Sequence, residues 1–221
     1  MTRQRAALQT AATLALMAIA LFGAAGRLDW GMAWAFLAAY VVFAIVSLSI
    51  LDLEFIAARG DLHGGTRADL VLGAFFTSLL YPGTLVTAGL DVRYGWSPAL
   101  PPAVEWAALA LFLAGYAGMV WAMRVNRFFI AIVRIQTERG HRVIEDGPYR
   151  FVRHPGYTSG ILAHTALPIA LGSLVALLPA VLGCVLIAAR TFSEERMLVR
   201  DLPGYTEYRR RVRWRLVPHV F

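Results

Sequence analysis

Long apolar runs, separated by short charged stretches, dominate the chain. A helix needs about 20 apolar residues to cross a hydrocarbon layer of about 30 Å. Runs of this length predict four spanning helices, at approximately residues 6–26, 33–51, 70–90 and 104–123. Tyr81-Pro82-Gly83 lies inside the third run, where proline should kink the helix because it lacks a backbone donor.

Two polar segments interrupt this pattern. The first, 52–69, separates the second and third spans, and the longer second one, 124–153, follows the fourth span. The composition of 124–153 predicts a structured loop with short helical pieces. Its apolar residues should rest at the membrane surface; they are Phe128, Phe129, Ile130, Ile132 and Val133.

The apolar stretch 157–189 is too long for one ordinary span and short for two. Gly172-Ser173 divides it into halves of about 16 residues, each about 24 Å long as a helix. We therefore expect a helical hairpin that returns to the side it entered from, followed by a charged, partly helical tail from Arg190. The predicted fold is an all-α polytopic membrane protein with four spanning helices and a C-terminal hairpin. Residues 1–123 would form the N-terminal helices, and 124–221 the loop, hairpin and tail of the same integrated domain.

Composition adds an orientation to this fold. The hydrophobic share is 58%, against about 45–50% in soluble domains. All 21 basic residues are arginine, the formal net charge is +7, and fifteen arginines lie from Arg124 onward. Because cytoplasmic loops collect positive charge, we expect the N-terminus, the loop and the tail on the cytoplasmic side. The same arginines can attract anionic lipid headgroups, whereas the lack of a separate basic domain argues against nucleic-acid binding.

The arginine-only composition looks bacterial, so the predicted location is a bacterial inner membrane. Cys184 is the only cysteine, which excludes an internal disulfide and a cysteine metal cluster. The sequence contains no convincing set of metal ligands.

Polar residues on both sides of the hairpin must meet at its open end. Segments 141–157 and 190–208 bring imidazole, phenol, guanidinium and carboxylate groups beside apolar helices. Ionisable groups at membrane depth are costly, so they indicate a functional site. Taken singly, each also has an ordinary structural explanation: Arg190 and Glu194, for example, are spaced as a helix-surface ion pair.

The order of these residues resembles a known family. The first motif is Gly147-Pro148-Tyr149-Arg150-x-x-Arg153-His154-Pro155-x-Tyr157. After the hairpin follow Arg190-Thr191-x-x-Glu194-Glu195-x-x-Leu198 and Tyr205-x-x-Tyr208. Together they resemble the isoprenylcysteine carboxyl methyltransferase family and, more distantly, the phospholipid N-methyltransferases. The resemblance covers about residues 126–218, less than half of the chain.

The resemblance implies S-adenosylmethionine as the methyl donor, held between the loop and the hairpin ends, and a lipophilic acceptor from the bilayer. Carried over by position, the cofactor-site candidates are Gln136, His141, Val143, Ile144, Gly147, Tyr149, His154, Pro155, Tyr157, Gly160 and Glu195. The candidates on the acceptor side, with a catalytic role, are Arg153, Arg190 and Glu194. One departure is Ser159, where the family often has glycine; Gly160 follows it.

The chemistry of the donor fits these residue types. Its amino group suits a carboxylate such as Glu195, its carboxylate suits His154, Tyr157 or a guanidinium group, and its adenine suits an apolar slot beside Val143 and Ile144. Methyl transfer is an in-line displacement, so positioning contributes much of the rate. A carboxylate acceptor needs no general base, whereas an amine or thiol needs one, for which His154 or Glu194 would serve.

Other functions stay open at this point. Membrane reductases of the sterol-reductase type share a similar hairpin, and the arginines would contact the extra phosphate of NADPH. A membrane scaffold or binding protein without turnover is a third possibility. The acceptor itself is equally open between an isoprenylcysteine-type carboxylate, another lipophilic carboxylate, a lipid amine and an isoprenoid-like small molecule.

Overall fold

The computed structural model describes residues 3–52, 55–56, 67–75, 80–218 and 220, and all regular structure in them is helical. The predicted all-α membrane fold is therefore confirmed. Four of the described helices are long and apolar enough to cross a membrane. They are α1 (Arg3–Ala25), α2 (Gly31–Ile50), α6 (Pro102–Val125) and α8 (Leu177–Asp201).

The third predicted span differs from the structure. Instead of one kinked helix over 70–90, there are two shorter helices, α4 (Arg67–Phe75) and α5 (Tyr81–Tyr94). Pro82 stands in the first turn of α5, where a missing backbone donor costs nothing because the first N–H groups of a helix have no intrahelical partner. The proline thus begins a helix rather than bending one. Most of the polar stretch 52–69 lies outside the described residues.

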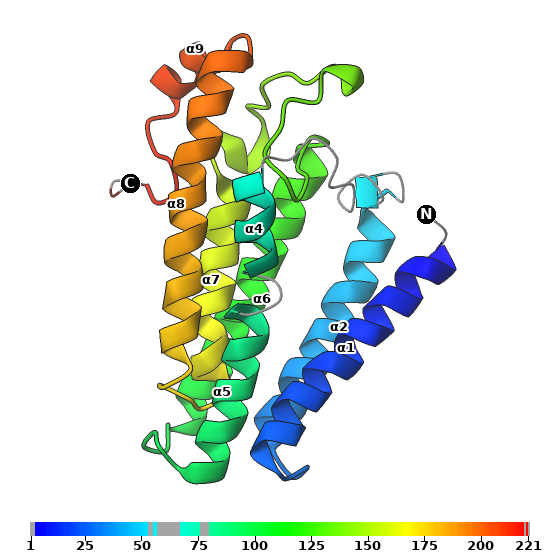
Figure 1. Ribbon diagram of the computed structural model, residues 1–221, viewed down its shortest axis with the longest axis vertical. Helices are drawn as coiled ribbons and strands as arrows, with labels where there is room; N and C mark the ends of the chain where they lie inside the picture. The colour runs from blue at the N-terminus through cyan, green and yellow to red at the C-terminus, as the bar shows by residue number, and fades with distance from the viewer. Residues whose placement is uncertain (1–2, 53–54, 57–66, 76–79, 219, 221) are drawn as a thin grey trace.

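The helices alternate in direction along the long axis of the molecule (Figure 1). The start of α1, the loop between α6 and α7, and the short helix α9 (Tyr205–Arg211) lie toward the same end. We call this end, with residues 126–154 and 205–216, the arginine-rich end. The turns that follow α1, α5 and α7 lie at the opposite end (Figure 1). This arrangement agrees with the connectivity expected from the sequence.

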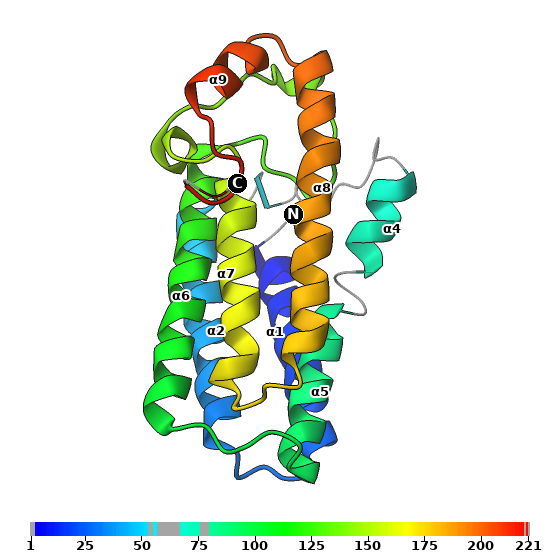
Figure 2. The ribbon, with the colours of Figure 1, turned by 90° about the vertical axis from the view of Figure 1, so that its left-hand side faces the viewer.

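The C-terminal hairpin consists of α7 (Pro155–Ala170) and α8, which lie side by side with α6 on the other flank of α7 (Figure 2). Its turn contains Gly172 at φ 73°, so the predicted division at Gly172-Ser173 is confirmed. The second arm is longer than expected, because α8 continues past Ala189 to Asp201. Arginine, glutamate, methionine and leucine dominate this extension, and all four are good helix formers.

Close helix contacts depend on small residues. A Cβ atom at Gly115 of α6 would lie 2.7 Å from the backbone nitrogen of Ala163 in α7, and one at Gly118 would lie 2.6 Å from Ser159 Oγ. Small residues allow such approach between membrane helices, where packing rather than water exclusion drives association. Ser159 therefore faces α6, and the departure from the family pattern is accommodated by two glycines on the neighbouring helix.

A buried carboxylate fixes the opposite end of the hairpin. Asp91 of α5 is 3% exposed and accepts hydrogen bonds from Ser97 N at 2.7 Å, Ser97 Oγ at 2.5 Å and Ser173 Oγ at 2.5 Å. Ser97 precedes α6 and Ser173 lies in the hairpin turn. These contacts thus join α5, the start of α6 and the hairpin turn. They fix the relative positions of the helices whose other ends form the arginine-rich end.

Candidate active site

The loop between α6 and α7 is ordered around Gln136. Two short 3-10 helices, Thr137–Arg139 and Gly147–Arg150, confirm the predicted helical pieces. Gln136 is 1% exposed; its Nε2 donates to the carbonyl oxygen of Phe128 at 2.8 Å, and its Oε1 accepts from Arg139 at 2.5 Å. Its backbone N–H donates to His141 Nδ1 at 3.2 Å. Gln136 therefore supports the fold of the loop.

Two of the five apolar residues expected to rest at the membrane surface turn inward instead: Phe128 and Ile132 are buried. The other three are half-buried. The Phe128 ring stacks on the His141 imidazole, with 4.5 Å between the ring centroids. The reason is that the loop folds back over the hairpin, so its apolar side chains are covered by protein instead of lipid.

The C-terminal residues cross the start of α7. The backbone N–H groups of Arg153 and His154 donate to the carbonyl oxygens of Trp214 (2.9 Å) and Arg215 (3.0 Å). Residues 212–216 thus form a strap, which we call the tail strap. The sequence motifs gave no role to these residues, and no local signal marks them, because their partners lie about sixty positions earlier.

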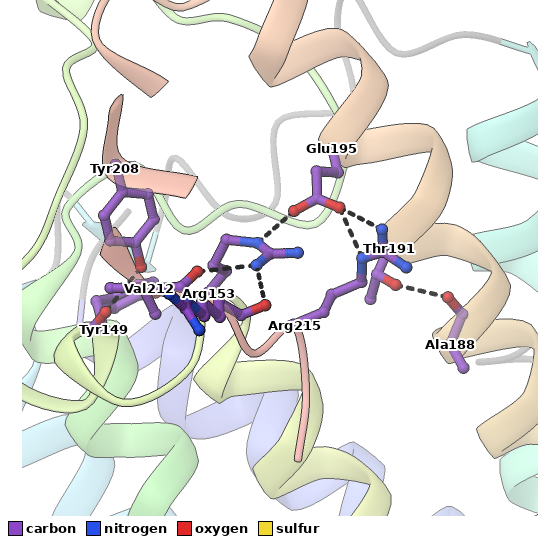
Figure 3. Close-up of polar contacts among 9 residues, drawn as sticks. Tyr149, Arg153, Ala188, Thr191, Glu195, Tyr208, Val212 and Arg215 are labelled. Carbon is purple, nitrogen blue, oxygen red and sulfur yellow. Dashed lines mark hydrogen bonds and ion pairs between the residues drawn. The ribbon is translucent and has the colours of Figure 1, made fainter. Parts of the chain in front are cut away.

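A buried ion cluster anchors the tail strap to α8 (Figure 3). Glu195 is 3% exposed; one of its oxygens accepts from Arg153 Nε and the other from Arg215 Nε at 2.6 Å. Arg153 Nη1 also donates to the carbonyl oxygens of Val212 (2.8 Å) and Arg213 (2.6 Å). Removing one member of such a cluster typically costs about 3–5 kcal/mol, because a buried charge loses its partner. Both Glu195 oxygens are therefore committed within the protein.

A pocket lies between the loop, the start of α7, the end of α8, and α9. We call it the polar pocket. The predicted site residues that line it are His141, Val143, Ile144, Tyr149, Arg153, His154, Tyr157 and Glu194. Four others do not line it: Gln136, Gly147, Pro155 and Glu195. The last two candidates, Gly160 and Arg190, line a second cavity instead.

Two buried polar atoms in the polar pocket, His154 Nε2 and Tyr205 Oη, have no hydrogen-bond partner within the described part of the chain. Burial is the largest influence on His154 and lowers its pKa below the ordinary 6.5, with Glu194 and Glu195 opposing the shift and Arg153 adding to it. Burial also raises the pKa of Tyr205. A neutral imidazole and a protonated phenol therefore line the pocket, and a polar ligand would satisfy both.

Glu194 is the carboxylate that faces the polar pocket. Its Oε2 accepts a hydrogen bond from Tyr157 Oη at 2.6 Å. The Tyr157 ring in turn stacks near the His154 imidazole, at 5.7 Å between centroids. These three side chains place a negative charge, a phenol and an imidazole on one wall.

The second cavity, of about 700 Å3, extends between α1, α2, α4, α5, α6, α7 and α8. Its lining is mainly apolar, and we call it the apolar cavity. Arg190 lines it; Nη2 donates to the carbonyl oxygen of Ala131 at 2.5 Å, and the guanidinium group lies 5.9 Å from the Tyr157 ring centroid. The apolar cavity and the polar pocket share one wall, made of Phe129, Ile130, Ile132, Gly156 and Tyr157.

Two glycines of the first motif hold close contacts. A Cβ atom at Gly156 would lie 2.2 Å from a ring carbon of Phe129, so any side chain at this position would displace the Phe129 ring in the shared wall. The sequence contains one signal of this close contact. Glycine is unfavourable inside a helix, so a glycine in a helical segment often marks a position where another group approaches closely. Gly147 has a φ of 56°, and its Cβ would lie 2.9 Å from Val125 Cγ2, so it forms a tight turn against α6.

Comparison with known proteins agrees with the motifs. No curated protein sequence matches the chain. Residues 108–200 match the sequence model of the isoprenylcysteine carboxyl methyltransferase (ICMT) family. The matched segment contains most of α6, the whole loop, α7 and almost all of α8, and hence the wall between the two cavities. Through this segment, which is less than half of the chain, the protein is similar to the isoprenylcysteine carboxyl methyltransferase family.

Proposed function

We propose that the chain is a membrane methyltransferase that takes its methyl group from S-adenosylmethionine and transfers it to a lipophilic acceptor. The observation that carries this proposal is the shared wall between the polar pocket and the apolar cavity. A water-soluble donor and a bilayer-borne acceptor need separate sites of opposite polarity that meet at one place. The match of residues 108–200 to the isoprenylcysteine carboxyl methyltransferase family model supports a methyltransferase activity.

The donor fits the polar pocket by chemistry. S-adenosylmethionine supplies an electrophilic methyl group on a sulfonium centre, flanked by an amino acid group and an adenosine. His154 Nε2 and Tyr205 Oη, buried without partners, suit the two oxygens of its carboxylate. The apolar side chains of Val143 and Ile144, which line the same pocket, suit the adenine.

The amino group of the donor is assigned to Glu194 rather than to its neighbour. Glu195 has both oxygens bonded to guanidinium groups and does not line the polar pocket. Glu194 lines the polar pocket, and one of its oxygens accepts a hydrogen bond from the Tyr157 hydroxyl. An ammonium group beside Glu194 would gain a charge-assisted hydrogen bond of about 1.5–3 kcal/mol. In this proposal Arg153 and Glu195 are positioning residues that hold the tail strap over α7.

A carboxylate is the acceptor that the apolar cavity suits best, because its lining includes the guanidinium group of Arg190. An oxygen lone pair of the acceptor would form the new C–O bond while the C–S bond breaks and its electrons stay on sulfur. No proton moves in this step, so no base is required. The chain contributes orientation across the shared wall, and orientation of two bound reactants is worth several kcal/mol of barrier.

A binding comparison tests the donor site. The purified full-length protein is titrated with S-adenosylhomocysteine by calorimetry, together with Glu194→Gln, Glu195→Gln and the exposed control Glu207→Gln. We expect Glu194→Gln to weaken binding about 10-fold or more at an unchanged melting temperature. Glu195→Gln should instead lower the melting temperature, and Glu207→Gln should behave as wild type.

The activity arm uses radiolabelled methyl donor and a membrane lipid extract. Label that mild base releases from the lipid fraction identifies a methyl ester, as expected for a carboxylate acceptor. Tight NADPH binding without S-adenosylhomocysteine binding would overturn the proposal in favour of a reductase. Donor binding without transfer to any lipid fraction would favour a binding protein without turnover.

A further inference from the structure

We propose that the methyl acceptor carries a second polar group at the end remote from its carboxylate, which Tyr81, Tyr116 and His164 recognise. This inference rests on the proposed function and specifies the class of its acceptor. We call the three residues the distal polar cluster. They come from α5, α6 and α7, and all three line the apolar cavity.

The distal polar cluster brings buried polar side chains together in the apolar cavity. The Tyr81 ring stacks on the His164 imidazole with 5.5 Å between centroids. Tyr81 and Tyr116 both line the apolar cavity, as does His164. The Tyr81 hydroxyl oxygen and His164 are buried. A phenol both donates and accepts, and Tyr81 Oη has no hydrogen-bond partner within the described residues, so a polar group of a ligand in the cavity can bond to it.

A purely hydrocarbon acceptor would not require these polar atoms. Phenylalanine would fill the space of either tyrosine ring, and burying a hydroxyl group or imidazole in an apolar environment carries a free-energy penalty. Ionisable groups at membrane depth that face a cavity indicate ligand recognition. Between Tyr157 and His164, the cavity lining on α7 consists of Gly160 and Ala163, which are small and leave room for a ligand chain.

The spacing along α7 sets the length of the acceptor. Tyr157, Gly160 and His164 all line the apolar cavity, and their spacing of three and four residues places them on one helix face. The seven residues from Tyr157 to His164 rise about 10 Å. An extended chain covers about 3.5 Å in three bonds, so on the order of nine bonds separate the two polar ends. The class is a medium-length lipophilic acid, straight-chain or isoprenoid, with a hydroxyl or carbonyl group at its far end.

A matched ligand pair tests this without requiring turnover. Decanoic acid and ω-hydroxydecanoic acid are titrated into the full-length protein in detergent, with and without S-adenosylhomocysteine. We expect the hydroxy acid to bind wild type about 10-fold more tightly. The double variant Tyr81→Phe/Tyr116→Phe should lose this preference and keep its affinity for decanoic acid. Tyr94→Phe, an exposed tyrosine at the end of α5, is the matched control and should keep the preference.

Each outcome of this binding comparison either supports or overturns the proposed second polar group. Equal affinities in wild type, a preference that survives in the double variant, or failure of both acids to bind would overturn it. If the double variant no longer binds decanoic acid, Tyr116→Phe alone provides the same comparison in a less altered cavity. Absence of S-adenosylhomocysteine binding would overturn the proposed function instead, and it is measured separately from the preference between the acids.

Discussion

Two adjacent glutamates of α8 show how position on a helix separates roles. Successive residues are rotated by about 100° around a helix of 3.6 residues per turn. Glu195 consequently meets Arg153 and Arg215 in a buried cluster, whereas Glu194 meets Tyr157 in the polar pocket. The sequence predicted a carboxylate for the donor amino group and named Glu195. Only the rotation of α8 about its axis shows that Glu194 is the one in the pocket.

His154 should make the stability of the protein sensitive to mild acid. Because burial lowers its folded pKa below 6.5, the unfolded chain binds a proton more readily as the pH falls through that value, and stability drops until the folded pKa is passed. We expect the melting temperature to fall from about pH 7.5 to about pH 5.5, and to fall less in His154→Gln. Thermal unfolding in detergent measures both, and equal falls would contradict the assignment.

At the scale of elements, the main feature of the candidate site is the loop between α6 and α7, which packs against the start of α7. The hairpin and the short helical pieces of the loop were predictable, because apolar length and glycine position are local features. The inward turn of the loop was not, since Phe129 is positioned against Gly156 and the start of α7 is held by the tail strap. These contacts join segments tens of residues apart.

Gly156→Ala should damage function more than stability. The added methyl group would meet the Phe129 ring, so the ring must move within the wall shared by the polar pocket and the apolar cavity. Alanine favours a helix over glycine by up to about 1 kcal/mol, which offsets part of the strain. We expect methyl transfer to fall about 10-fold or more, equivalent to at least 1.4 kcal/mol of barrier.

The matched control is Gly23→Ala in α1, where a Cβ atom would meet nothing within 4 Å. Its methyl transfer should equal that of wild type, and melting temperatures of both variants report their folding. Normal transfer by Gly156→Ala would show that the shared wall tolerates displacement of Phe129.

For the whole molecule, the charge distribution and the helix directions indicate the same orientation in the membrane. The loop, the tail strap and the start of α1 lie toward the arginine-rich end, and the opposite end carries the α5–α6 connection and the hairpin turn (Figure 1). Four passages before the loop were expected from the sequence; α1, α2 and α6 are long enough to supply three of them, and the third is divided into the shorter helices α4 and α5. By the positive-inside rule, the arginine-rich end should face the cytoplasm.

Cysteine labelling measures this orientation. Cys184 is first replaced by serine, and Arg142→Cys in the loop or Ala99→Cys in the α5–α6 connection is added to that background; both positions are exposed. In intact cells, a membrane-impermeant maleimide should label the cysteine at 99 but reach the one at 142 only after permeabilisation. The reverse pattern would place the polar pocket on the outer side of the membrane.

The sequence by itself determined the membrane class, three of the four predicted spans, the hairpin and the family motifs, because apolar length, charge and residue order are properties of contiguous segments. Tertiary structure decided which side chains the motifs bring together. Arg153 and Glu195 became a clamp for the tail strap, Gly156 and Phe129 part of a shared wall, and Tyr81, Tyr116 and His164 a distal cluster. Each of these three features depends on the rotation of a helix about its axis and on contacts between distant segments. A local sequence pattern encodes neither the rotation nor the contacts.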